Sequence, residues 1–288
     1  LVISVLYSGQ VVMPMKEVAG SIAMISSGDF NETMQITGYS EAEDISDKFN
    51  SMLSVLQNLE DARQEFVSNV SHELKTPITS VKVLAESLIG QENVPVELYQ
   101  EFMVDINEEL ERMNKIINDL LTLVKMDKNA SEVNISEVNI NEFLEAILKQ
   151  LQPIADKRNI EMIFESVRSV TAQVDEVKLA MAFRNLIENA IKYNYDNGWV
   201  RVSLNADHKF FYLKVSDSGV GIPEELQDSI FERFYRVDKA RSRETGGNGL
   251  GLAITRNAIL LHRGSIKVHS IEQQGTTFAV RIPLMYSE

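Results

Sequence analysis

The chain has 288 residues, a formal net charge of −14 and no cysteine. Its length exceeds that of one typical domain, and its apolar fraction of 44% is ample for globular cores. The acidic balance argues against nucleic acid as a partner, because phosphate backbones are bound by clustered lysine and arginine. The absence of cysteine excludes disulfides, thiolate chemistry and zinc sites built on cysteine.

Residues 1–12, LVISVLYSGQVV, are apolar and uncharged. A helix that spans a bilayer needs about 20 such residues, so this segment is too short by itself. These residues alone fit two interpretations equally well. They begin an ordinary buried helix, or they are the cytoplasmic end of a transmembrane helix that continues upstream.

Two helical patterns joined by a connector follow. Pro14 opens the first, which runs to about residue 26, and Gly28 and Asp29 close it. The connector, residues 30–40, leads into an acidic run that suits a helix N-terminus. Apolar residues then recur at spacings of four and three, which is the period of a coiled-coil seam and requires a partner helix. They are Ile45, Phe49, Met52, Leu56, Leu59, Phe66 and Val70.

Helix, connector and helix in this order resemble a HAMP signal-relay module. The resemblance implies that residues 13–60 form the relay and that residues 1–12 end a transmembrane helix. We therefore expect attachment to the bacterial plasma membrane through an upstream helix, with this portion of the protein in the cytoplasm.

A further long helix is predicted over residues 96–126. Only the short segment GQENVPV separates it from the helix before it, so the two are expected to form an antiparallel hairpin over residues 61–128. One hairpin leaves its apolar stripe half exposed, whereas two hairpins from two chains make a four-helix bundle. The sequence therefore predicts a homodimer. The stripe comprises Leu98, Phe102, Ile106, Leu110, Met113, Ile117, Leu120 and Val124.

A polar linker, residues 128–131, separates the hairpin from a part whose sequence pattern is different. There, strand-like and helical patterns alternate, which predicts a separate α/β domain over residues 129–288. The expected strands are residues 160–164, 200–204, 210–215, 265–269 and 277–282, and the expected helices are residues 141–155, 176–193 and 250–261.

His72 lies in the segment FVSNVSHELKTP. If Val70 takes an a position of the heptad, His72 falls at c and faces solvent. An exposed histidine is inert in most proteins, but a carboxylate at Glu73 can hold the imidazole tautomer that leaves the other ring nitrogen free to attack. Pro77 clashes with the carbonyl of Glu73, so we expect a kink at this turn.

Residues 66–77 resemble the phosphoacceptor box of the sensor histidine kinases. The resemblance implies that His72 accepts the γ-phosphoryl group of ATP and passes it to an aspartate of a response-regulator receiver domain. The spacing of Glu73 and Thr76 resembles that of family members that also dephosphorylate the regulator, in which the threonine places a water for attack. The catalytic residues expected from this resemblance are His72, Glu73 and Thr76.

The helical segment NLIENAIKYN places four polar residues on one face: Asn185, Asn189, Lys192 and Tyr193. Amide oxygens suit Mg²⁺, and a lysine on the same face suits phosphate. A helix with two solvated amides and a packed tyrosine accounts for this segment equally well.

The segment DSGVGIP follows a predicted strand. The carboxylate of Asp217 can accept a hydrogen bond from an exocyclic amine such as that of adenine, and Gly219 and Gly221 allow a sharp turn beside a ligand. Taken alone, such a string is most often a simple turn.

In GGNGLGLAI, the residues Gly247, Gly249 and Gly251 precede a helix. Backbone N–H groups at such a helix start make an anion site. The basic segment between the two glycine runs, which includes Arg236, is predicted to be a lid whose base packs through Phe231 and Phe234. A solvated surface loop explains its polarity but not its position.

In this order, the segments resemble the ATP-binding domain shared by histidine kinases, gyrase-type ATPases and Hsp90-like chaperones, with GTTFAVRIP as the closing strand. The resemblance implies a Bergerat (GHKL) fold that binds ATP and Mg²⁺, with Asn189 as the metal ligand. It implies nucleotide contacts from Asn185, Asn189, Lys192, Tyr193, Asp217, Gly219, Gly221, Arg236, Gly247, Gly249, Leu250, Gly251 and Thr277.

The expected fold is therefore multidomain, with an all-α N-terminal part followed by an α/β two-layer sandwich. Two alternative functions on this fold are a GHKL-type ATPase and a catalytically silent scaffold. Such ATPases place a carboxylate four residues before the metal-binding asparagine, where this chain has Asn185. Asn248 and Arg263 stand where small residues are common in the family, and we expect both to tune the lid.

Overall fold

The computed structural model describes residues 40–90, 95–128, 133–237 and 247–286. The chain divides into two units, residues 1–72 and 73–288. The predicted transmembrane end, most of the predicted relay, the 128–131 linker beyond its first residue and much of the predicted lid lie outside the described residues. None of the helices in the described ranges has the length and hydropathy that a bilayer crossing requires.

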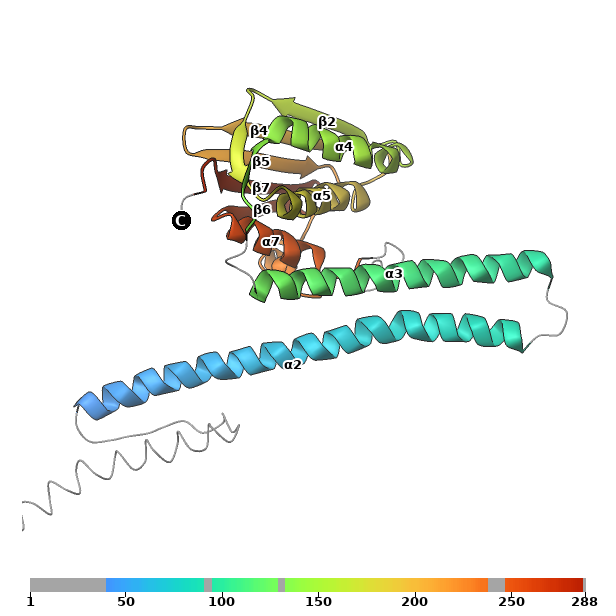
Figure 1. The fold of residues 1–288 in the computed structure, drawn as a ribbon, viewed down its shortest axis with the longest axis horizontal. Helices are drawn as coiled ribbons and strands as arrows, with labels where there is room; N and C mark the ends of the chain where they lie inside the picture. Colours follow the sequence, from blue (N-terminus) through green and yellow to red (C-terminus); the bar gives the residue numbers. More distant parts are fainter. Residues whose placement is uncertain (1–39, 91–94, 129–132, 238–246, 287–288) are drawn as a thin grey trace, which may run out of the picture. The chain divides into compact units, whose positions relative to one another are not determined.

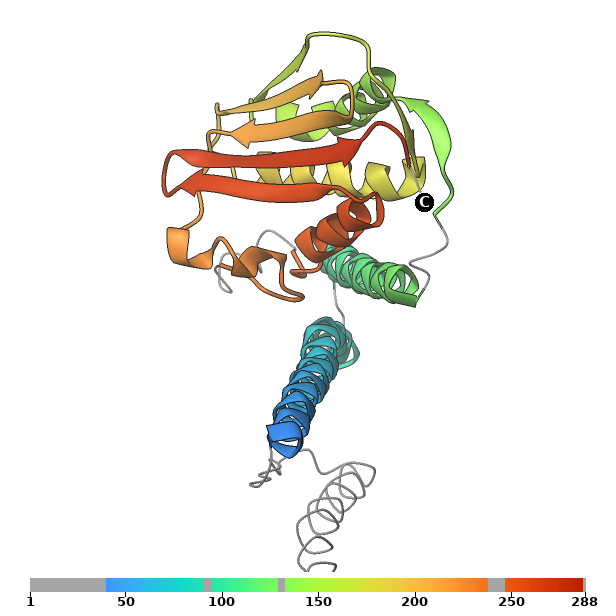
Figure 2. The same ribbon diagram turned by 90° about the vertical axis from the view of Figure 1, so that its left-hand side faces the viewer.

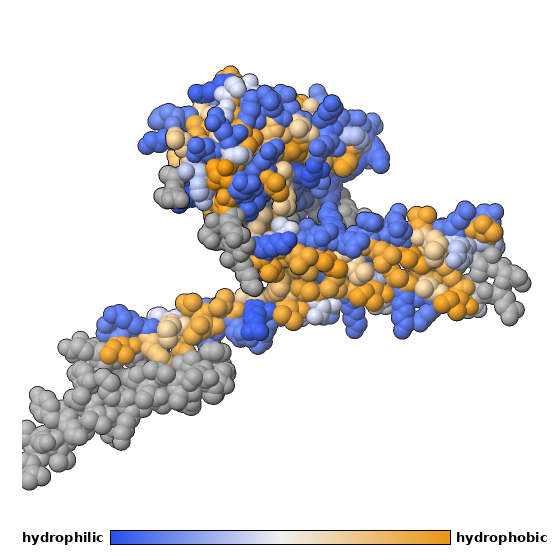
Figure 3. Space-filling model, viewed as in Figure 1, coloured by the Kyte–Doolittle hydropathy of each residue, from blue (hydrophilic) through white to orange (hydrophobic). Residues whose placement is uncertain are grey.

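Helix α2 (Ser40–Ile89) begins in the first unit and continues through Pro77, whose ring is buried, into the second. In the first unit, Ile45, Met52 and Leu59 are 46%, 49% and 66% exposed. Part of the predicted coiled-coil seam is therefore exposed in a single chain, and the rest, Phe49, Leu56, Phe66 and Val70, is half-buried. Figure 3 shows the apolar side chains along this helix.

Helix α3 (Val96–Lys128) carries two apolar faces. On the predicted stripe, Leu110, Ile117 and Val124 remain 40%, 39% and 44% exposed. A second set, which the heptad pattern did not predict, is buried: Leu123 and Met126 join the core of the α/β part. One face of α3 is thus used within the chain, and the other is left for a partner helix.

The α/β part is built on a five-stranded sheet in the order β2-β4-β5-β7-β6. Strands β2 and β4 run parallel, and the other neighbours are antiparallel. The strands are β2 (Glu161–Ser166), β4 (Trp199–Ala206), β5 (Phe210–Asp217), β6 (Ser265–Ile271) and β7 (Gly275–Pro283).

Three helices cover one face of this sheet, which gives the predicted two-layer sandwich (Figures 1 and 2). They are α4 (Ile140–Asp156), α5 (Glu176–Lys192) and α7 (Gly251–Leu261). Each lies within a residue or two of its predicted range. A small antiparallel pair, β1 (Ser136–Asn139) with β3 (Thr171–Val174), was not predicted. Two 3-10 turns, η1 (Glu224–Leu226) and η2 (Ser229–Phe231), follow β5.

Alternation of apolar and polar residues explains which side of each strand meets the helices. In β4, for example, Val200, Val202 and Leu204 are buried, whereas Arg201 between them is exposed. Side-chain caps start two of the helices: Asn139 accepts from N–H groups of α4, and Asp175 accepts from the Lys178 N–H of α5.

His262 joins the end of α7 to the start of α5. Its Nε2 accepts a hydrogen bond from the Asp175 N–H at 2.8 Å, and its Nδ1 lies 2.7 Å from the carbonyl oxygen of Ala258. Because Nε2 accepts, the proton of the neutral ring sits on Nδ1 and is donated to Ala258. The ring is 1% exposed, and this burial lowers the pKa of His262.

This contact predicts a loss of stability in mild acid. Because the pKa of His262 is lower in the folded than in the unfolded chain, protonation favours unfolding as the pH falls below about 6.5, the ordinary value. We expect the urea midpoint of the chain to fall from pH 7.5 to pH 5.5 by more than that of His262→Gln. Equal falls in the two proteins would show that His262 does not contribute, and His269→Gln, an exposed histidine on β6, serves as the control.

Candidate functional site

Asn185 ties α5 to the start of α7. Its Nδ2 donates to Thr255 Oγ1 at 2.9 Å, and the Thr255 hydroxyl donates to the Gly251 carbonyl at 2.9 Å. A Cβ added at Gly251 would lie 2.4 Å from Asn185 Oδ1, so a larger residue there would displace the Asn185 side chain. Asn189, one turn further along α5, is half-buried, and its carbonyl accepts from the Tyr193 N–H at 2.9 Å.

Asp217 ends β5 with a buried carboxylate that is 8% exposed. Its Oδ1 accepts from the Gly219 N–H at 2.8 Å and from the Thr276 N–H at 3.3 Å. Burial raises the pKa of Asp217 to about 6, although these two hydrogen bonds oppose the shift. Both hydrogen bonds end on Oδ1, which leaves Oδ2 to accept from a ligand.

The turn after β5 brings this carboxylate to the end of α5. The Val220 N–H donates to the Tyr193 carbonyl at 3.0 Å, and Gly219 lies against the same carbonyl. Gly221 follows in the turn and lies against the carbonyl of Ile271, at the end of β6. The segment DSGVGIP and the segment NLIENAIKYN, which are separate in sequence, therefore meet at Tyr193.

Lys192 lies in a group of cations. Burial lowers its pKa to about 8, and Lys115 and Arg112 of α3 and Arg236 beyond β5 act in the same direction, whereas Glu188 opposes them. The ammonium also lies 4.9 Å from the centre of the Tyr193 ring, and Gly247 lies beside it. Several positive charges held close together favour an anionic ligand, although Glu188 and Glu73 offset part of the charge.

Arg236 lies at the base of the predicted lid, and its side chain is 11% exposed. Its Nη1 donates to Glu73 Oε1 at 3.3 Å, so the residue beside His72 pairs with the lid base. Within the described part of the chain, its Nε and Nη2 are buried without a hydrogen-bond partner. A buried guanidinium with unused donors suits a ligand rich in acceptor oxygens.

The second glycine run forms the start of α7. Leu250 is the N-cap and is fully buried, and it provides no side-chain cap to the helix. Gly249 lies against the backbone of Phe234, and Phe231 packs edge-on against Phe278 with ring centres 6.2 Å apart. The base of the lid therefore packs on the domain as predicted.

Thr277 is the one predicted contact that the structure places elsewhere. Its hydroxyl donates to Ser216 Oγ at 2.9 Å, on the opposite side of the strands from Asp217. Thr276 lies beside Asp217 instead, because side chains alternate along β7. The Thr276 hydroxyl contacts Ser270 Oγ at 2.9 Å.

Two residues that position the site were missed. Arg158 donates to the carbonyls of Ile191, Lys192 and Asn194 at 2.7 to 2.9 Å and so caps the end of α5 that carries Lys192. Gly275 has φ +111°, and a Cβ there would lie 1.9 Å from the Asp217 carbonyl oxygen. Neither a lone arginine in a turn nor a glycine before a strand is a distinctive sequence signal.

Arg263 follows the far end of α7, where its guanidinium lies 5.4 Å from the centre of the Tyr286 ring. It thus lies at the opposite end of the helix from Leu250, and its effect on the lid stays a prediction. Asn248 does lie at the lid's end: its Nδ2 donates to Asp119 Oδ2 of α3 at 2.7 Å.

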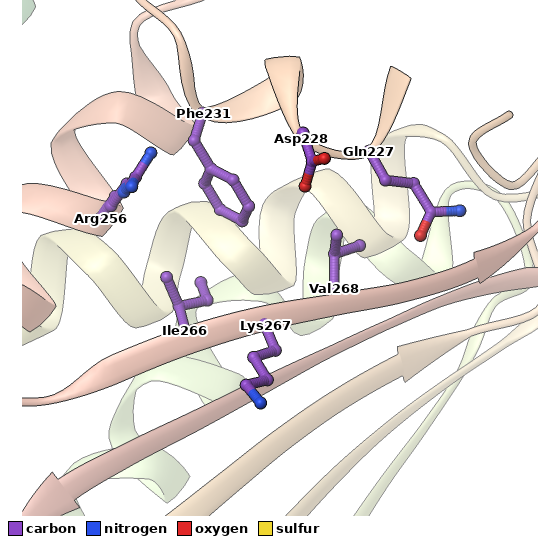
Figure 4. A pocket seen from close by; sticks show the side chains of 7 residues that line it. All are labelled: Gln227, Asp228, Phe231, Arg256, Ile266, Lys267 and Val268. Carbon is purple, nitrogen blue, oxygen red and sulfur yellow. The ribbon is translucent and has the colours of Figure 1, made fainter. Parts of the chain in front are cut away.

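A groove of about 420 Å³ lies on another side of the domain, between η2, α7 and β6 (Figure 4). Phe231, Ile266 and Val268 provide its apolar lining, and Arg256 lies over the Phe231 ring at 5.8 Å. Asp217, Asn189 and the glycine runs do not line it, so the groove is separate from the candidate site.

Two sequence-family models match the chain. Residues 62–129 match the His Kinase A (phospho-acceptor) domain, and residues 174–285 match the family described as histidine kinase-, DNA gyrase B-, and HSP90-like ATPase. The sensor protein kinase WalK of Staphylococcus epidermidis is 36% identical over 281 residues, which cover 96% of this chain and 44% of WalK. The chain belongs to the sensor histidine kinases of two-component systems.

A WalK sequence of Staphylococcus aureus is also 36% identical, over 94% of this histidine kinase chain and 64% of that relative. The chain therefore spans from less than half to about two thirds of the length of these relatives. Among solved structures, histidine kinase ThkA in complex with response regulator protein TrrA has a TM-score of 0.64 at 24% identity, over 79% of this chain and 64% of ThkA. The Acinetobacter baumannii histidine kinase AdeS has a TM-score of 0.61 at 23% identity, over 74% of this chain and 98% of AdeS. These structures share the fold.

Proposed function

We propose that this chain is a kinase core that transfers the γ-phosphoryl group of ATP to His72. The observation that carries the proposal is the presence of both halves of such a reaction on one chain. His72 is exposed on α2 within the phosphoacceptor match, and the ATPase match contains a buried carboxylate, a glycine-rich helix start and a cation cluster.

The chemistry of these groups fits ATP. Asp217 Oδ2 would accept from the adenine amine, while the N–H groups at the start of α7 and the cations Lys192 and Arg236 would hold phosphates. The other predicted contacts are Asn185 and the glycines of both runs. They would shape the site by letting neighbouring segments pack closely around the ligand. Thr276 replaces Thr277 in this proposal.

Mg²⁺ fits beside Asn189. In the described ranges no group of three His, Cys, Asp or Glu side chains could hold a metal ion. Mg²⁺ usually keeps waters and binds through few protein ligands together with substrate phosphates, so one amide oxygen is a sufficient protein contribution. When bound, ATP and its metal supply the phosphoryl group and neutralise part of its charge.

Transfer forms a bond between a His72 ring nitrogen and phosphorus and breaks the bond to the ADP oxygen. Glu73 would hold the proton on the other ring nitrogen, which keeps the attacking nitrogen unprotonated. The bond from Arg236 ends on Oε1 of Glu73, and a carboxylate has a second oxygen that can accept from the ring N–H. Positioning and charge stabilisation are expected to provide most of the rate.

A plain ATPase is not favoured. An enzyme that hydrolyses ATP needs a base to activate water, and Asn185, at the position where related ATPases carry a carboxylate, is an amide whose Nδ2 is bonded to Thr255. The retained motif residues argue against a silent scaffold.

The partners follow from the exposed surfaces. The apolar faces of α2 and α3 suit a second copy of the hairpin in a four-helix bundle. A response-regulator receiver domain would dock along α2 from His72 to Thr79; the fold neighbour ThkA was solved with a response regulator. The domain limits 1–12, 13–60, 61–128 and 129–288 stay predictions, as do the HAMP relay and membrane attachment.

Incubation of the chain with γ-labelled ATP and Mg²⁺ tests the proposal. A label that survives alkali but is lost in acid is the signature of phosphohistidine. Release of labelled phosphate into solution without label on the chain would favour the ATPase instead.

The proposed phosphatase activity depends on Thr76, whose side chain would place the attacking water. We expect Thr76→Ala to lower dephosphorylation of the regulator about tenfold or more, since a positioned group contributes at least that much, and to leave autophosphorylation within about twofold. Ser87→Ala, on the same helix but outside the segment from His72 to Thr79, is the control. An equal loss of both activities in Thr76→Ala would contradict the separation of roles.

A further inference from the structure

Asn248 joins two parts of the second unit through one side-chain amide. Its Oδ1 accepts from the Leu250 N–H at 3.1 Å, at the N-cap of α7. Its Nδ2 donates to Asp119 Oδ2 of α3 at 2.7 Å. The same side-chain amide therefore bonds to the backbone of the glycine run and holds that run to α3 of the hairpin.

The contact with Asp119 is partly shielded from water, since both side chains are half-buried. Burial raises the pKa of Asp119, although the hydrogen bond from Asn248 and the nearby Lys115 oppose the shift. A hydrogen bond to a carboxylate in such a place is stronger than one at an open surface, so it contributes to holding α3 against the domain. Leu123, one turn further along α3, is fully buried in the same interface.

The hydrogen bond from the Leu250 N–H to Asn248 competes with the binding of a phosphate at this helix start. N–H groups at a glycine-rich helix start are the donors that phosphate oxygens use, and here one of them is already taken by Asn248. Arg236, at the other end of the lid, is also bonded to the hairpin through Nη1 and Glu73 of α2. Its Nε and Nη2 have no partner among the described residues, so of the two contacts the one made by Asn248 is the one that occupies a phosphate donor.

We infer that Asn248 couples the glycine run to the hairpin: phosphate that takes the Leu250 N–H releases the Asn248–Asp119 contact, and loss of that contact favours nucleotide. The inference rests on the proposed function, since it requires a nucleotide phosphate at this run. Coupling of this kind is reciprocal, so weakening the contact with α3 must strengthen nucleotide binding by the same factor. Asp119 acts as a positioning residue, and nucleotide does not touch it.

Calorimetric titration of the full chain with a non-hydrolysable ATP analogue and Mg²⁺ tests the coupling. We expect Asp119→Ala to bind the analogue about three- to tenfold more tightly than the wild type, because the binding-competent population rises. Asp119→Asn removes the charge but keeps an oxygen that accepts from Asn248, so its affinity should stay near that of the wild type. Tighter binding by both variants would mean simple charge repulsion and would overturn the inference.

Hydrogen exchange provides a readout without nucleotide. In the free chain, Asp119→Ala should raise exchange over residues 116–126 of α3, whereas Glu111→Ala, an exposed acid on the same helix, should not. In the wild type, the analogue should raise exchange over the same residues. Unchanged protection in both experiments, or equal affinities of wild type and Asp119→Ala, would overturn the coupling inference but not the proposed function. A wild type that binds no analogue would overturn the proposed function as well.

Discussion

Asp217→Asn is expected to weaken ATP binding on the order of 100-fold, or about 2 to 3 kcal/mol, and to leave the fold intact. The asparagine oxygen can accept from Gly219 and Thr276 as Oδ1 does now. Its amide group would then take the place of Oδ2 and present donors to the adenine amine, which is itself a donor. The loss comes from that mismatch in a buried site, where an unpaired polar group is costly.

Titration calorimetry with ATP and a urea melt of the same sample measure both parts of this expectation. Asp207→Asn, in the β4–β5 turn, is the control and should bind normally. Because the pKa of Asp217 is about 6, wild-type affinity should also fall as the pH drops below 6 and the carboxyl becomes protonated. Near-normal ATP binding by Asp217→Asn would show that Asp217 does not contact adenine.

Periodicity predicted the helices and central strands because each is long enough to show its repeat. The α3 and α5 ranges needed only one or two residues of correction. Strands β1 and β3 have four residues each, too few for a period, and their pairing joins segments that are about 30 residues apart. A heptad pattern also gives a helix one buried stripe, which is why the second apolar face of α3 was missed.

The motifs predicted which segments lie close together but not the side of a strand on which each side chain lies. Asp217, Tyr193 and the glycine runs converge in the structure. Thr276 rather than Thr277 lies beside Asp217, since the face of a strand depends on register. Arg263 was singled out because small residues are common at its position in the family, and it lies at the far end of α7 from the glycine run. The contacts Asn248–Asp119 and Arg236–Glu73 join residues more than a hundred positions apart, and no local pattern shows such pairs.

His72→Gln is expected to abolish labelling of the chain by γ-labelled ATP. The proposed transfer has one nucleophile, and glutamine keeps the size and polarity of His72 but has no ring nitrogen to form a phosphoramidate. Nucleotide binding should be unchanged, because none of the proposed ATP contacts is altered. His269→Gln, an exposed histidine of the α/β part, should label as the wild type does.

Whether His72 is the phosphoacceptor is therefore best tested by labelling wild type, His72→Gln and His269→Gln side by side, with the label assayed for stability in acid and alkali. We predict an acid-labile, alkali-stable label on the wild type and on His269→Gln, and none on His72→Gln. Label of undiminished amount on His72→Gln would show that the phosphoryl group goes to another residue and would contradict the assignment of His72.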